Sequence, residues 1–140
     1  MRAHMNARLG CRVRHQKRDE GSAAIEAAIL FPIVLLLVMT IIQAAVYYHA
    51  QDVVQSAANG GAVVGALRDG TSDAAEAEAR ARIERAGGTS LLDDYDVSAT
   101  HTGTEVTITV RGTAKTFIPG LPPLKVTQTV IAPVERFTAP

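Results

Sequence analysis

Residues 27–46 read AAILFPIVLLLVMTIIQAAV, and this stretch decides how the chain is organised. It is uncharged over roughly twenty residues, the length that an α-helix needs to cross the hydrocarbon core of a bilayer. Pro32 lies inside the run, but a membrane helix tolerates a proline because neighbouring groups can satisfy the carbonyl that it frees. We therefore expect a transmembrane helix over residues 22–48 that contains Pro32.

The residues before this helix are basic. The first twenty residues hold six lysines and arginines against Asp19 and Glu20. Because juxtamembrane basic residues stay on the cytoplasmic side, we expect residues 1–21 to form a cytoplasmic leader and the carboxyl-terminal part to lie outside the cytoplasmic membrane. The single cysteine, Cys11, falls in this leader, so the exported part has no disulfide.

Two other interpretations of the amino-terminal region stay open. A cleaved secretory signal also begins with basic residues, but its apolar part normally covers about 7–15 residues, fewer than here. The small residues Ala44, Ala45 and Ala50 keep that alternative open. A basic arm that binds nucleic acid is the second alternative. From Asp52 onward eleven acidic residues face eight basic ones, so nucleic acid is not the expected partner of that region.

The helical pattern continues beyond the apolar run. Small and apolar residues recur every three or four positions after His49, with polar residues on the opposite face: Ala50, Val53, Val54, Ala57, Gly61 and Val64. We expect residues 49–70 to be an amphipathic extension of a helix that runs from Ala23 to Leu67. Glycines at 60, 61 and 65 weaken this helix by about 1 kcal/mol each. The G-x-x-x-G spacing of the last two permits close approach of helices inside lipid. Because they lie well past the apolar run, we expect them to pack against the protein's own sheet, with a helix–helix contact as the alternative.

The remaining residues, 71–140, predict a small exported head. Thr71, Ser72 and Asp73 are capping residues before a short helix, AAEAEARARIERA, at residues 74–86. Alternation of threonine and valine predicts three antiparallel strands, at residues 95–100, 105–110 and 124–131. Their apolar face needs a cover, which the amphipathic part of the long helix can supply. The expected fold class is α+β, in a pilin-like arrangement.

A single carboxylate at the edge of the membrane helix carries most of the functional information. The passage RDEGSAAIE, residues 18–26, places Gly21 and Ser22 before the apolar run and Glu26 at its start. A charge at the centre of a membrane helix costs about 2.5–3.5 kcal/mol on insertion scales, so Glu26 needs a partner or a role. The simpler alternative is that the helix is an ordinary signal anchor and that the Glu26 side chain extends to the membrane–water interface.

The passage RDEGSAAIEAAILFPIVLLL resembles the amino-terminal signature of the TadE-like family, the TadE-, TadF- and TadG-type minor pilins of tight-adherence type IV pilus systems. The likeness consists of a basic leader, Gly21-Ser22, Glu26 and Pro32. It implies that a prepilin peptidase cuts between Gly21 and Ser22. It also implies that other pilin-like subunits are partners, that Glu26 pairs with the new α-amine of a neighbouring subunit, and that the protein has a structural role in pilus assembly.

No catalytic constellation is found in the sequence. The histidines stand apart, with His101 alone in a predicted strand, and no paired spacing suits a metal. Asp93, Asp94 and Asp96 lack the glycine and the terminal glutamate of a calcium loop. We therefore expect no enzyme activity, no cofactor, no metal site and no small-molecule substrate. An unprocessed, membrane-anchored binding module of the cell surface is the main alternative function, and a membrane-tethered enzyme is a weaker one.

Overall fold

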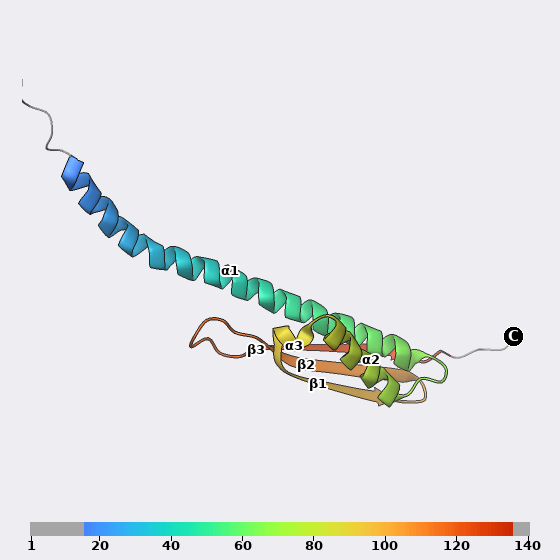
Figure 1. Cartoon of the computed structure of the whole chain (residues 1–140). Coiled ribbons are helices and arrows are strands. Elements are labelled where there is room, and N and C mark those ends of the chain that lie inside the picture. The colour runs from blue at the N-terminus through green and yellow to red at the C-terminus, as the bar shows by residue number, and fades with distance from the viewer. Residues whose placement is uncertain (1–15, 136–140) are drawn as a thin grey trace, which may run out of the picture. The chain divides into compact units, whose positions relative to one another are not determined.

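The computed structural model describes residues 16–135, with side chains described from Gly21 onward. The expectations for Cys11 and for most of the basic leader lie outside these residues. The chain divides into two units, with the boundary between Val38 and Met39, and each unit is described by itself. One helix, α1 (Gln16–Ala66), contributes residues to both units (Figure 1).

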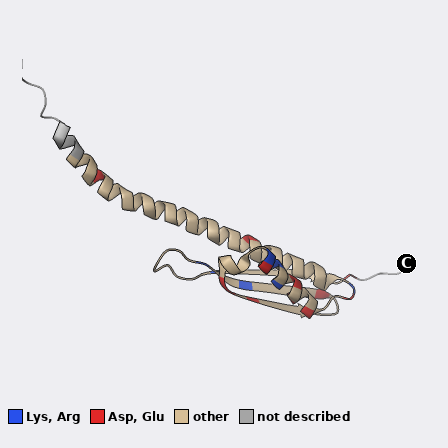
Figure 2. Cartoon of the chain, viewed as in Figure 1, with Lys and Arg blue, Asp and Glu red and all other residues tan. Residues whose placement is uncertain are grey.

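The first unit consists of the amino-terminal part of α1. The helix starts at Gln16, earlier than the expected Ala23, and continues through Pro32 without a break. Every side chain from Gly21 to Ile42 is exposed, although most are apolar, and Figure 2 shows a long uncharged stretch along this helix. Gly21–Ala66 is long and apolar enough to cross a membrane, and none of its most apolar window is buried within the protein.

The second unit is built on a three-stranded antiparallel sheet of order β1-β2-β3. Its strands are β1 (Leu92–His101), β2 (Glu105–Ala114) and β3 (Leu124–Pro133). Each contains the corresponding predicted strand and is longer, because pairing extends into residues with weak β preference such as Gly112, which faces Tyr95 on β1 and Val126 on β3. The expected α+β class, with a long helix, a short helix and three antiparallel strands, is confirmed (Figure 1).

The core lies between the inner face of the sheet and two helical segments, the carboxyl-terminal part of α1 and the second helix, at residues 72–85. The strands contribute fully buried apolar residues such as Val106, Ile108 and Val110, while α1 contributes mainly small ones, such as Ala57 and Ala58. The predicted amphipathic pattern of α1 is therefore confirmed. Small residues on a helix allow close approach to its neighbours, which raises the number of dispersion contacts in the core.

The glycines of α1 make close contacts and do not break the helix, which continues to Ala66. A Cβ at Gly65 would lie 2.8 Å from Val106 Cγ2 of β2, as expected for packing against the sheet. A Cβ at Gly61 would instead lie 2.7 Å from the Ala75 carbonyl oxygen of the second helix. The expected sheet contact therefore holds for Gly65, whereas Gly61 makes the alternative contact between helices.

The second helix, α2 (Ser72–Arg85), begins where its capping residues predict. Thr71 is extended, and its hydroxyl accepts a hydrogen bond from the Ala74 amide at 3.1 Å. A third, four-residue helix, α3 (Gly88–Leu91), was not predicted. It follows Gly87, which has a φ of 69°, a left-handed conformation that glycine adopts without steric cost.

Charged side chains of α2 bind the outer edge of β1. Glu76 Oε1 accepts a hydrogen bond from the Ala99 amide at 2.9 Å, and Arg80 donates to the Val97 carbonyl at 3.0 Å. The two charged groups lie 3.7 Å apart and form an i, i+4 ion pair on α2. Because an edge strand presents unpaired amides and carbonyls, these contacts satisfy two groups that would otherwise remain open to another strand.

Candidate functional site

The residues predicted as a processing segment all lie on the exposed surface of α1 in the first unit. Gly21, Ser22, Glu26 and Pro32 are each exposed to solvent. Ser22 and Glu26 are four residues apart, so they lie on the same face of the helix, one turn from each other. The helix thus brings together the predicted cut and the carboxylate, whereas Pro32 lies more than a turn further along.

The Gly21–Ser22 peptide bond is helical in this structure. A peptidase that binds an extended substrate therefore has to unwind the chain locally before it can act. Glycine favours that opening because it is about 1 kcal/mol less favourable than alanine inside a helix. A Cβ at Gly21 would meet no atom within 4 Å, so the glycine is not required by any side-chain packing in this unit.

Glu26 is a carboxylate on an otherwise apolar helix surface. Among residues 21–135, whose side chains are described, no lysine or arginine forms an ion pair with it. Its neighbours along α1 include Ile25, Ile29 and Leu30, which are more than half exposed. In a bilayer such a group is stabilised by a cation from outside this segment or by reaching the membrane–water interface.

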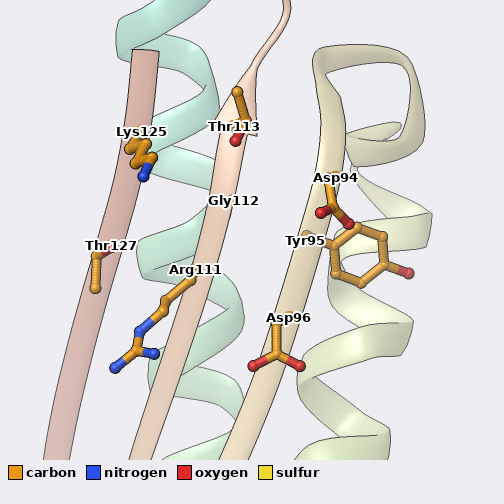
Figure 3. Close-up of a pocket in the computed structure, with 8 residues that line it drawn as sticks. All are labelled: Asp94, Tyr95, Asp96, Arg111, Gly112, Thr113, Lys125 and Thr127. Carbon is orange, nitrogen blue, oxygen red and sulfur yellow. The ribbon is translucent and has the colours of Figure 1, made fainter. Parts of the chain in front are cut away.

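The acidic residues of the head lie at one corner of the sheet, beside basic residues of the neighbouring strands. Asp94 and Asp96 project from the outer face of β1 beside Arg111 of β2, as Figure 3 shows, while Tyr95 turns away from them. They border a shallow, open depression of about 220 Å³, which is lined by Asp94, Tyr95, Asp96, Arg111, Gly112, Thr113, Lys125 and Thr127. Ligand pockets usually enclose most of their ligand, which this open surface does not.

The histidine and acidic side chains of the described residues do not gather into a metal-binding group. Residues 16–135 contain no group of three histidine, cysteine or acidic side chains placed to hold a metal ion. His49 is exposed on α1. His101 lies on β1, as expected from its place in a predicted strand, and is half buried; its Nε2 has no hydrogen-bond partner among the described residues.

Gln43 is the polar residue whose role the sequence analysis missed. It lies within the apolar run yet is only 4% exposed. Its Nε2 donates to the Lys115 carbonyl at 2.9 Å, and its Oε1 accepts from the Phe117 amide at 2.9 Å. Both partners belong to the loop between β2 and β3. A lone amide in a long apolar run was the available signal, because such a group needs partners when it is buried.

Comparison with known proteins gives one informative result. A family model described as TadE-like protein matches residues 21–63, which supports the resemblance drawn from the amino-terminal passage. The matched segment begins at Gly21 and ends in the part of α1 that packs against α2 and the sheet. No curated protein sequence and no solved structure matches this chain.

Proposed function

We propose that this chain is a TadE-like minor pilin, or pseudopilin, with a structural role in the assembly of a Tad/Flp-type IV pilus. A prepilin peptidase removes the basic leader by cutting between Gly21 and Ser22. The mature protein is a single-pass protein of the cytoplasmic membrane, with the head outside. It assembles through α1 with other pilin-like subunits. The observation that carries the proposal is the family match, which starts at the residue where the leader is expected to end.

The chemistry of the mature amino terminus supports this proposal. Cleavage frees an α-amine on Ser22 with a reference pKa near 7.7–8, so most of it is charged at neutral pH. Glu26 then lies close to the start of the shortened helix, where a negative charge interacts favourably with the helix dipole. The amine of a neighbouring subunit supplies the cation that Glu26 lacks, with the chain's own amine, one helical turn away, as a competitor.

The structure of the head argues against a secretory signal cut near Ala44, Ala45 or Ala50. Ala50 is fully buried in the core, and Gln43 is hydrogen-bonded to the loop between β2 and β3. A cut at any of these positions would detach residues of α1 from the unit in which they pack. Retention of α1 with the head is what a pilin-like subunit requires.

Amino-terminal sequencing of the protein purified from membranes tests the proposal. We expect the mature chain to begin at Ser22 in cells that possess the peptidase, and Gly21→Ala to accumulate the uncut form. Because a Cβ at Gly21 meets no neighbouring atom, the uncut form is not explained by misfolding. Recovery of only full-length chains beginning at Met1 would refute processing and favour the unprocessed binding module.

A second variant separates the role of Glu26 from processing. We expect Glu26→Gln to be cut normally but to co-purify poorly with other pilin-like subunits, because the amide cannot pair with a charged amine. Asp52→Asn is the matched control, since Asp52 is an exposed carboxylate on the same helix beyond the apolar run. Equal co-purification of the two variants would show that Glu26 has no part in assembly.

A further inference from the structure

The loop between β2 and β3, residues 115–123, is hydrogen-bonded to α1 at a residue that belongs to the apolar run of the helix. Both polar atoms of the Gln43 side chain bind this loop, through the Lys115 carbonyl and the Phe117 amide. Gln43 precedes Val46, the last residue of the apolar run, by about one helical turn. Gln43 and the loop belong to the same unit of the protein.

Aromatic residues of α1 indicate where the membrane boundary falls. Tyr47 packs against the core, while Tyr48 is 65% exposed, and their rings form an edge-to-face pair with centroids 5.9 Å apart. Tyrosine is enriched at the level of the lipid headgroups because its ring is apolar and its hydroxyl is polar. Gln43 lies one turn, roughly 6 Å, to the membrane side of Tyr47. The loop that it binds therefore reaches below the tyrosine level.

The side chains at the tip of the loop are apolar and exposed. Phe117 is 54% exposed and Leu121 is 37% exposed, although the adjoining strands bury most of their inward-facing apolar residues. Ile41 and Ile42, which directly precede Gln43 on α1, are exposed as well. The loop thus extends the apolar surface of the helix at its outer end.

The backbone of the loop has few amides that need water. Three of its nine residues are prolines, which have no N–H. Three further amides are bonded: Lys115 to the Leu91 carbonyl, Phe117 to Gln43, and Leu121 to the Ile118 carbonyl. An irregular segment enters an apolar medium only where its backbone groups are satisfied, so this composition lowers the cost of leaving water.

The charges around the loop favour a lipid surface. Lys115 and Lys125 flank it, and residues 106–134 contain no acidic side chain. The acidic residues at the same end of the sheet lie on β1, which pairs with β2. Asp94 lies opposite Thr113, and it lines the same depression on the outer face of the sheet as Lys125. Lysine side chains can keep their charge among the headgroups while the apolar part of the segment lies deeper.

We propose that residues 115–123 form a membrane-seated loop, which inserts Phe117 and Leu121 into the outer interface of the bilayer that α1 crosses. The occupant of this surface is lipid, and the loop and Tyr48 together fix the height of the head above the membrane. The inference rests on the transmembrane placement of α1 that the proposed function requires.

The absence of tryptophan from the chain allows a direct test. The full chain is reconstituted into phosphatidylcholine–phosphatidylglycerol vesicles as three single-tryptophan variants: Phe117→Trp, Tyr48→Trp and Thr100→Trp. Tyr48 reports the helix at the interface, and Thr100 is an exposed residue at the opposite end of the sheet. We expect brominated lipids to quench Phe117→Trp at least half as strongly as Tyr48→Trp, and Thr100→Trp hardly at all.

Each other outcome overturns the inference. If Tyr48→Trp is quenched but Phe117→Trp responds only to aqueous acrylamide, the helix spans the bilayer and the loop does not enter it. If Phe117→Trp is shielded from both quenchers, a protein surface such as a second copy of the chain covers the loop. If Tyr48→Trp is not quenched, the transmembrane placement itself fails. Leu121→Trp repeats the measurement at a second loop position, in case tryptophan at 117 disturbs the contact with Gln43.

Discussion

Two adjacent glycines of α1 provide a sharp test of how the helix packs. Gly60→Ala and Gly61→Ala remove the same unfavourable residue type from the same helix, so each gains about 1 kcal/mol in helix preference. Their surroundings differ. A Cβ at Gly61 would lie 2.7 Å from the Ala75 carbonyl oxygen and 3.2 Å from Ala79 Cβ, whereas at Gly60 it would meet only the far end of the Arg82 side chain.

The expected stability changes therefore have opposite signs. At Gly61 the obstacle is backbone, so α2 must shift while Ala75 and Ala79 are fully buried. Overpacking of this kind costs about 1–3 kcal/mol, and we place this case near the upper end because a backbone atom cannot rotate away. Gly61→Ala is then destabilising by about 1–2 kcal/mol. At Gly60, the flexible end of Arg82 swings outward and loses its partly exposed ion pair with Glu78. Because an exposed pair contributes less than the gain in helix preference, the variant is slightly stabilised.

Thermal unfolding of the full chain in detergent, followed by circular dichroism, measures the difference. A change of 1 kcal/mol corresponds to about 4–8 °C in Tm for a folded unit of this size. We expect Gly61→Ala to lower Tm by about 4–16 °C and Gly60→Ala to raise it by a few degrees at most. A higher Tm for Gly61→Ala than for the unmodified chain would refute the close packing of α2 on α1.

Three further predictions concern polar contacts of the second unit. Glu76→Ala should lower stability by about 1 kcal/mol and promote self-association, because it frees the Ala99 amide at the sheet edge; thermal unfolding and sedimentation velocity measure the two effects. The hydrogen bond from Arg82 lowers the pKa of Glu78 below its usual value of 4.5, with Arg85 adding to the effect and desolvation opposing it. The stability that ionised Glu78 contributes is complete above pH 4.5 and is lost as pH falls through the lowered pKa. Glu78→Gln should therefore make Tm less dependent on pH at acid pH, as measured by thermal unfolding of the variant and the unmodified chain across a pH series. Gln43→Leu should cost about 1–3 kcal/mol in thermal unfolding, because the Phe117 amide loses its partner, whereas Gln55→Leu, an exposed change on the same helix, should be neutral.

The sequence predicts those elements whose side-chain period is regular. Strict alternation in Val106, Ile108 and Val110 identifies β2 and its buried face, and three- and four-residue spacing identifies the extension of α1. Helix α3 was missed because four residues are too few to establish a period. The extra length of the strands also escaped prediction, because it comes from pairing with a neighbouring strand and not from local preference.

The candidate processing segment could be named from the sequence because its residues are close together along the chain. Gly21, Ser22 and Glu26 lie within two turns of one helix, so their juxtaposition follows from helical geometry alone. The two hydrogen bonds of the Gln43 side chain, by contrast, join residues more than seventy positions apart. No local pattern predicts that contact, because it depends on the order and register of the strands.

The two edges of the sheet differ in whether other parts of the chain bind them, and this difference limits how copies of this protein can join. Glu76 and Arg80 occupy groups on the outer edge of β1. No strand within residues 16–135 pairs with the outer edge of β3. Strand addition is therefore hindered at β1 by α2 and not at β3, and two copies that met through β3 would each present a partly blocked β1 edge to a third. A repeat that extends beyond such a pair is then expected to come from contacts other than strand pairing at this sheet.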